Sequence, residues 1–207
     1  MAGSDVKARF ISDEVAADAD GISASAQVGN NAALVIGGAL ADSGAVTLAG
    51  SGRKLVVVSG GDDSGISFTI VGTDVNGSAL TESLTGADTG TATSSNYFKT
   101  ITSITAVGDP AGTVTAGTSA SAADVVFAGR TRLKGYSIVS GGSAGVIEFF
   151  NGDPNASGSA IFKARTIGTD NTTIDNTIPE EGVVFEDGLY VVYTIGTVDM
   201  MTFFHGS

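Results

Sequence analysis

The side chains that could do chemistry in this sequence are few, and none stands in a pattern that catalysis requires. His205 is the only histidine, so any Ser/His/Asp triad would have to use it. Paired carboxylates could hydrolyse glycosides. Each candidate pair lies beside glycine in an expected turn, where solvated acids are the simpler interpretation. These pairs are Asp62/Asp63, Glu180/Glu181 and Glu186/Asp187.

Metal-ligating residues are equally sparse. The chain has no cysteine, which excludes thiolate metal sites and disulfides. Asp18-x-Asp20-Gly21 is similar to the start of a calcium loop, but Gly29 occupies the twelfth position, where such a loop needs glutamate. We therefore expect no enzymatic activity, no cofactor and no resident metal. Calcium bound across a subunit contact is the alternative left open.

Basic residues form the most informative pattern. Arg130, Arg132 and Lys134 alternate along the chain, as do Lys163 and Arg165, so each set projects from one face of a predicted strand. The first set opens the second predicted domain, on what we expect to be an edge strand whose intervening residues face the other way. These five are half of the ten basic residues, beside 22 acidic ones. Two interpretations are open: a docking surface for an acidic neighbour, or solvated charges that protect an edge strand.

Composition restricts the possible partners and the fold class. A net charge of -12 argues against a nucleic-acid partner, because phosphate binding needs a basic face. No apolar run approaches the roughly 18 residues of a membrane-spanning helix, so we expect no membrane partner. The hydrophobic content of 42% excludes wholesale disorder. Its valine, isoleucine and phenylalanine, mixed with serine and threonine, suit pleated sheet and predict an all-β protein.

Short alternating segments and glycine-rich breaks predict two small Gly-rich β-sandwich or barrel-like units preceded by an extended N-terminal arm. The arm is residues 1–30, the first domain 31–118, the linker 119–129 and the second domain 130–207. Asn76-Gly77 predicts a two-residue hairpin turn. The expected strands are 33–36, 45–49, 54–59, 65–72, 79–84, 97–107, 113–116, 131–139, 145–150, 160–166, 182–185, 189–195 and 198–204.

The first 30 residues have too few large apolar side chains to bury much surface alone. Val6, Phe10 and Ile11 are prominent among those few, so we expect them to pack on a neighbouring subunit. The alternative is that this segment supplies the first strand of the following domain. A short helix over 13–19 and a strand over 22–28 are expected within it.

Two stretches carry a resemblance to a known class of protein. RKLVVVSGGDDSGISFTIVGTDVNGSALTESLTG with YFKTITSITAVG resembles a β module of tailed-bacteriophage virion proteins. KGYSIVSGGSAGVIEFFNG, IPEEGVVFEDGLYVVYT and MTFFHG resemble a second small module of phage structural proteins. Together the two stretches cover about residues 45–118 and 134–206, as patterns of strands and turns without a functional fingerprint.

The resemblance implies a virion component, most similar to capsid decoration (cement) proteins. The implied partners are the major capsid protein and further copies of the same chain, often in a homotrimer. The implied location is the capsid surface, after synthesis in the cytoplasm of the host bacterium. A receptor- or glycan-binding tail or fibre module and a head–tail connector component are the alternatives.

Overall fold

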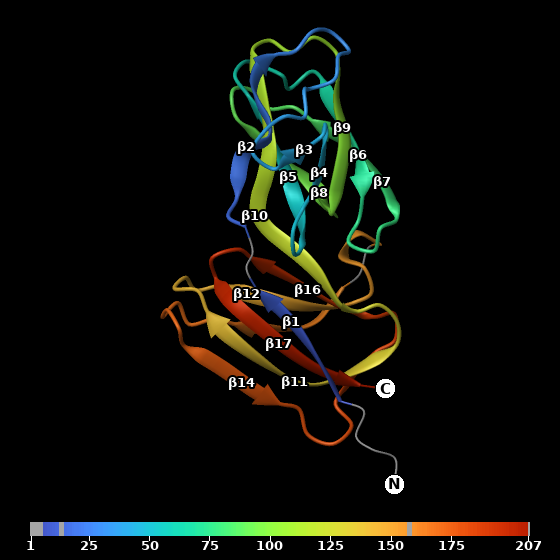
Figure 1. Cartoon of the computed structure of the whole chain (residues 1–207), viewed down its shortest axis with the longest axis vertical. Helices are drawn as coiled ribbons and strands as arrows, with labels where there is room; N and C mark the ends of the chain where they lie inside the picture. Colours follow the sequence, from blue (N-terminus) through green and yellow to red (C-terminus); the bar gives the residue numbers. More distant parts are fainter. Residues whose placement is uncertain (1–5, 13–14, 157–158, 207) are drawn as a thin grey trace. The chain divides into compact units, whose positions relative to one another are not determined.

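The computed structural model describes residues 6–12, 15–156 and 159–206 (Figure 1). Strands make up nearly all the regular structure of these residues, and the one helical element among them is a 3-10 turn, η1 (Pro154–Ala156). No helix in this part of the chain is long and apolar enough to cross a membrane. The predicted all-β class is confirmed. The finer prediction, that each unit is a sandwich or a barrel, stays a prediction.

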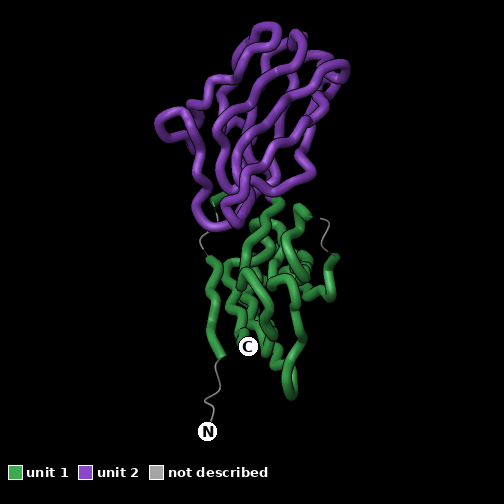
Figure 2. Tube along the Cα trace, turned by 90° about the vertical axis from the view of Figure 1, so that its right-hand side faces the viewer, with its two compact units in different colours: residues 1–16, 121–207 green, residues 17–120 purple. Residues whose placement is uncertain are grey.

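The chain divides into two compact units, coloured separately in Figure 2. Unit 1 comprises residues 1–16 and 121–207, and unit 2 comprises residues 17–120. The strand β10 (Thr113–Phe127) passes from unit 2 into unit 1 without a break, so the predicted linker at 119–129 is wrong for most of its length. Its small and polar residues hid the strand from the sequence pattern, because the ladder hydrogen bonds of β10 need no apolar alternation.

The N-terminal segment belongs to both units. β1 (Lys7–Ser12) pairs with β17 (Val198–Gly206), and β2 (Asp18–Gln27) pairs with the 113–118 part of β10. The segment is therefore strand paired within the chain rather than a free arm. β2 pairs with a strand of the following domain, as the alternative interpretation held, whereas β1 pairs with the last strand of the chain. The predicted helix over 13–19 falls partly outside the described residues, and its last two residues lie in β2.

Unit 2 contains two sets of paired strands. One sheet has the order β3-β4-β9-β6-β7, and β8, β5 and β2 join the first part of β10 in the other. Its core residues come from both sets and include Leu55, Phe68, Ile70, Phe98 and Val114. Besides β2 and β10, the strands of unit 2 are β3 (Ala41–Asp42), β4 (Ala45–Thr47), β5 (Gly52–Ser59), β6 (Ser67–Thr73), β7 (Ala79–Thr85), β8 (Thr91–Phe98) and β9 (Thr100–Val107).

Three local predictions in unit 2 need correction. The expected strand 33–36 does not form, and of these residues Ala33 makes an isolated bridge to Thr105. The hairpin β6–β7 forms, but only Gly77 has a positive φ, and Asp74 N donates to Ser78 O across a longer loop than the two-residue turn expected. This is the geometry of a turn closed by one left-handed residue. The predicted strand 97–107 is interrupted at Lys99, because β8 pairs with β5 whereas β9 pairs with β6 in the other sheet.

The core of unit 1 is built from residues of two sheets. β1-β17-β11-β14 form one sheet in which β15 also pairs with β11, and β13-β12-β16 continue into residues 121–127 of β10 in the other. The core cluster is rich in aromatic side chains, among them Phe149, Phe185 and Phe203. The remaining strands are β11 (Thr131–Ser140), β12 (Val146–Asn151), β13 (Ala160–Arg165), β14 (Thr173–Thr177), β15 (Val183–Phe185) and β16 (Leu189–Thr194).

Candidate interaction surface

The outward face of β1 and β17 carries two half-exposed aromatic side chains. β1 lies at the end of its sheet, and β17 is its only strand partner within the described residues. Ile11 and Phe203 point into the core, so alternation turns Phe10 and Phe204 to the opposite face. Phe10 is 50% exposed and Phe204 39%. Exposed side chains of this size on an edge strand are unusual for a surface that faces only water.

The pairing register brings these two rings together. Phe10 lies opposite Thr202 and Phe204 lies opposite Ala8, which makes the two phenylalanines diagonal neighbours on adjacent strands. Val6 directly precedes β1, continues the alternation and is 44% exposed. We refer to Val6, Phe10 and Phe204 as the apolar row. Val6 and Phe10 are predicted interface residues, whereas Phe204 is not, because its apolar neighbours in the sequence are typical of a core strand.

Ile11, predicted as an interface residue, is instead part of the unit 1 core. It is 4% exposed and belongs to the same cluster as Met201, its partner in the β1–β17 register. The error has a simple cause: a strand that pairs within its own sheet must bury one of its two faces. In β1 the buried face holds Ile11 and the free face holds Phe10.

The first basic set lies in the interior of a sheet, not on an edge strand. β11 pairs with β17 on one side and with β14 and β15 on the other. Arg130 precedes the strand and pairs with Glu186 at 2.7 Å. Arg132 pairs with Glu181 at 3.1 Å, and Lys134 Nζ donates to the Glu181 carbonyl at 2.6 Å. As expected from the alternation, the intervening Thr131 and Leu133 are buried. The three basic residues of the first set therefore already contact Glu181 or Glu186 of the same chain.

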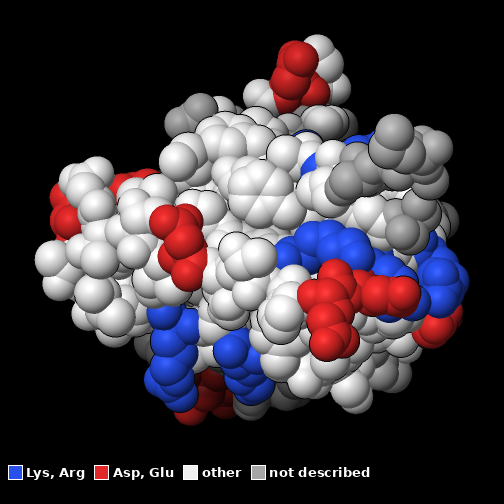
Figure 3. All heavy atoms as spheres, turned by 90° about the horizontal axis from the view of Figure 1, so that it is seen from below, with Lys and Arg blue, Asp and Glu red and all other residues white. Residues whose placement is uncertain are grey.

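The second basic set does lie on an edge strand. β13 ends the order of its sheet, and the side chains of Lys163 and Arg165 are exposed on it. Lys163 forms an ion pair with Glu148 on the neighbouring β12. No ion pair of Arg165 occurs within the described residues. Charges at such a position discourage edge-to-edge pairing. Figure 3 shows basic side chains close to acidic ones on one face of the molecule.

One ion pair near the apolar row was not foreseen from the sequence. Arg9 Nη2 lies 3.5 Å from Oδ2 of Asp124, a residue of β10 whose side chain is 9% exposed. The pair joins β1 of one sheet to β10 of the other, at the edge where β1 ends its sheet. Asp124 fell in the predicted linker, so no sequence signal marked it as buried.

His205 is buried in unit 1 and is only 6% exposed. Its Nδ1 lies 3.4 Å from Thr131 Oγ1, and its ring centroid lies 5.2 Å from that of Phe127. Burial, and secondly the charge of Lys7, lowers the pKa of His205 from its ordinary value of 6.5. A covered, preferentially neutral imidazole packed against Phe127 has little access to a substrate in solution.

The predicted acid pairs do not behave alike. Asp62 is exposed and accepts hydrogen bonds from the hydroxyl and, secondly, the amide of Ser64, which lower the pKa of Asp62. Asp63 is 1% exposed, and its Oδ1 accepts from Ala111 N at 2.8 Å, so the expectation of a solvated residue is wrong for it. Glu181 and Glu186 form ion pairs with Arg132 and Arg130, respectively. Among the described residues, no three histidine, cysteine or acidic side chains gather as a metal ion would require.

The chain matches no protein-family model and no curated protein.

Proposed function

We propose that this chain is a non-enzymatic structural protein of a tailed-phage virion. In this proposal it is a capsid decoration protein that self-associates as a homotrimer and binds the major capsid protein at the capsid surface. The proposal comes from the resemblance of the two stretches that begin at Arg53 and Lys134. It is supported by the all-β fold and by the burial of the single histidine.

The observation that carries the self-association is the apolar row on β1 and β17. Three large apolar side chains face outward beside the outer edge of β1, which has no strand partner in the described part of the chain. A second copy that covers the row removes apolar surface from water, which is worth about 25 cal/mol per Å². The same copy can hydrogen-bond to the free edge of β1.

The charges beside the row favour a second copy over a strongly charged partner. Arg130 and Arg132 each stand next to a glutamate of the same chain, so this face presents both signs at short spacing. A mixed surface of this kind can meet itself without net repulsion, whereas a uniformly acidic surface cannot. Bridging of adjacent capsomers by such oligomers stabilises the assembled shell, because the oligomer binds only the assembled form.

The test of self-association is a double substitution in the apolar row. Phe10→Ser with Phe204→Ser should convert the trimer to monomer in analytical ultracentrifugation at micromolar concentration. Val35→Ser in unit 2 is the control, since Val35 is a large apolar side chain that is 77% exposed outside the row. A wild-type chain that sediments as a stable monomer, or a double variant that stays trimeric, contradicts the proposal.

The test of the virion role is a count of copies per particle by quantitative mass spectrometry. A copy number comparable with that of the major capsid protein supports decoration of the shell. A number that corresponds to a single ring per particle supports the connector or tail alternative. Absence of the chain from purified particles overturns the virion proposal.

A further inference from the structure

The unit 1 sheet that contains β1 has a second free edge at β14. Its order is β1-β17-β11-β14, and Figure 1 shows these four strands side by side, with β1 and β14 outermost. β15 pairs with β11 at residues 131–133, beyond the end of β14 rather than outside it. Within the described residues, β14 pairs only with β11, just as β1 pairs only with β17. Each outer edge is therefore a template on which a further strand can add.

The two edges match in length and in level. Residues 8–12 of β1 and 173–177 of β14 occupy the same levels of the sheet, because both segments are in register with the same part of β17 and β11. At one end of this span, Phe204 pairs with both Ala8 and Gly135, and Gly135 in turn pairs with the last residue of β14. Two edges of equal length can pair along most of that length if they meet.

Strand direction fits a pairing between β1 of one copy and β14 of the next. Neighbouring strands are antiparallel at each step from β1 to β14, so β1 and β14 run in opposite directions. Copies related by rotation about an axis along the strands would therefore bring β1 and the next β14 together as an antiparallel pair. A trimer needs a contact of this kind between two different surfaces, because β1 paired with another β1 is related by a two-fold axis and closes a dimer.

Charge favours β14 over the other strands that β1 could meet in unit 1. β1 carries Lys7 and Arg9 and no acidic residue, whereas β14 carries Asp175 and no basic residue. Arg9 already pairs with Asp124, so Lys7 supplies most of the attraction. The edge strand β13 carries two basic residues and no acidic one, so it would repel β1, as a second β1 would.

We propose that β1 of each copy pairs with β14 of the next copy, so that three copies close one ring of strands. This inference rests on the proposed self-association as a homotrimer, and it identifies the surface of the second copy that meets β1. Each copy contributes four strands to the ring. At about 4.8 Å between neighbouring strands, the closed ring is roughly 20 Å across.

The size of the ring decides which face of the sheet turns inward. The second sheet of a sandwich packs about 10 Å from the first, so the second sheets of three copies cannot fit inside a ring of this width. The face opposite the core therefore turns toward the common axis, and it carries Phe10 and Phe204 of the apolar row. Arg132 is in register with Gly206, beyond the level of Phe204, so its ion pair with Glu181 lies toward one mouth of the ring.

Disulfide cross-linking tests the pairing directly, because the chain has no cysteine of its own. Ala8→Cys or Ser12→Cys on β1 is combined with Thr173→Cys, Asp175→Cys or Thr177→Cys on β14. The combinations cover the staggers that ring closure can impose. Within one copy, β1 and β14 are three strand spacings apart, about 14 Å, which no disulfide spans. At least one double variant should therefore give a covalent trimer on non-reducing electrophoresis after mild oxidation.

The controls separate this pairing from other contacts between copies. Each single-cysteine variant should remain uncross-linked, because no neighbouring copy then offers a thiol at the contact. Ala8→Cys with Ile161→Cys places the second thiol on the edge strand β13, where Ile161 is 46% exposed, and it should also remain uncross-linked. Analytical ultracentrifugation under reducing conditions verifies that each variant still assembles as wild type does.

Three results would overturn the inference. Covalent dimers of Ala8→Cys alone would show that β1 meets β1 across a two-fold axis. Double variants that are trimeric under reducing conditions but form no disulfide between β1 and β14, or that cross-link no better than the β13 control, would refute the pairing and leave the proposed self-association standing. A wild-type chain that is monomeric would refute the proposed self-association and this inference together.

Discussion

Units 1 and 2 carry the same net charge and differ in how they present it. Unit 1 has 13 acidic and 7 basic residues and unit 2 has 9 and 3, so each sums to -6. Yet the ion pairs seen among the described residues all lie in unit 1. Seven of the nine exposed large hydrophobic side chains in this part of the chain also lie there. Net charge therefore says little about which unit faces a partner.

The cores differ in the same direction. The ring-to-ring contacts found in the described residues all lie in unit 1, including Phe149 and Phe162 stacked at 4.2 Å between centroids. Unit 2 buries mostly aliphatic side chains, with Phe68 and Phe98 among them. Few large apolar side chains of unit 2 are exposed to solvent, whereas unit 1 exposes the three side chains of the apolar row. If the chain self-associates as proposed, the contrast favours unit 1 as the interacting unit, and unit 2 serves as the internal control for each experiment.

The largest expected effect is that of deleting residues 1–28, which removes both β1 and β2. Because Ile11 is buried in unit 1 and Ile22 in unit 2, both units should lose stability. Thermal unfolding followed by circular dichroism should show a lower melting temperature for the whole chain. Retention of both folds with weaker association alone would restore the arm interpretation. Ile11→Ala and Ile22→Ala should each affect one unit only.

Next in size are two matched core truncations. Phe149→Ala should destabilise unit 1 and Phe68→Ala should destabilise unit 2, each by about 3–5 kcal/mol, since both side chains are fully buried. Urea titration read by amide NMR signals resolves the units separately. If either substitution unfolds both units together at the same urea concentration, the two units form one cooperative structure and the comparison fails.

A smaller effect is expected on lowering the pH from 7 through the titration of His205, and it should be confined to unit 1, which holds the only histidine. The folded pKa of His205 lies below 6.5, so the unfolded chain takes up the proton first as pH falls. The contribution of His205 is complete above about pH 6.5 and is lost between 6.5 and the folded pKa. His205→Asn should flatten that part of the unit 1 stability profile. A stability that rises on acidification through this window would contradict the burial argument.

The smallest expected effect is that of reversing the charges of the first basic set. Arg132→Glu with Lys134→Glu should change the free energy of unfolding by only about 1 kcal/mol, because the Arg132–Glu181 pair is partly exposed, with 22% and 80% of the two side chains accessible, and is therefore screened. It should slow self-association at low salt, where repulsion from Glu181 and its neighbours is strongest. Arg165→Glu is the control, and its association rate, measured by stopped-flow light scattering, should stay close to wild type. Equal association rates for all variants at low and high salt would mean that Arg130, Arg132 and Lys134 are ordinary solvated residues with no role in association.

Much of the fold could be derived from the chain alone, because it rests on local alternation. Phe68 and Ile70 are buried on one face of β6, as the pattern ISFTIVG predicts. Each strand expected from residue 131 onward lies close to an observed one, although β14 was not expected. The alternation of Thr131 and Leu133 against the basic set was also correct. These features depend only on the period of two that a pleated strand imposes.

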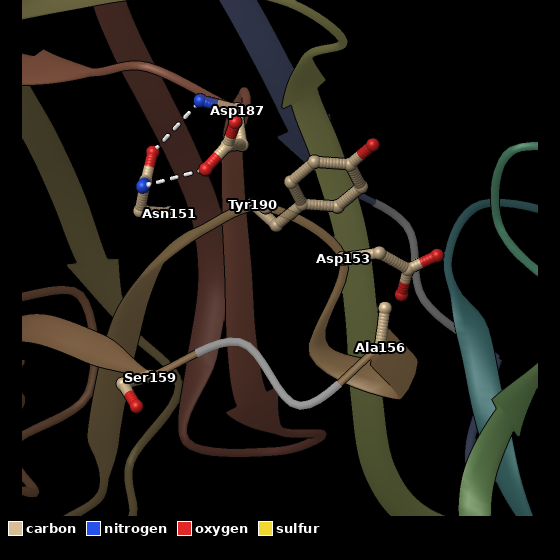
Figure 4. Close-up of a pocket in the computed structure, with 7 residues that line it drawn as sticks. Asn151, Asp153, Ala156, Ser159, Asp187 and Tyr190 are labelled. Carbon is tan, nitrogen blue, oxygen red and sulfur yellow. Dashed lines mark hydrogen bonds between the residues drawn. The ribbon is translucent and has the colours of Figure 1, made fainter.

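Other features were decided only when distant segments paired. β14 and residues 115–124 of β10 are mostly polar or small, and they form strands because distant segments, such as β11 beside β14 and β16 beside β10, supply hydrogen-bonding partners. Pairing of β1 with β17 buried Ile11 and left Phe10 outside, although the two residues are adjacent and equally apolar. The two hydrogen bonds between Asn151 and Asp187 join residues 36 apart in the chain (Figure 4). A strand's partner, and hence which of its faces water sees, depends on residues far away in the sequence, so no local pattern can record it.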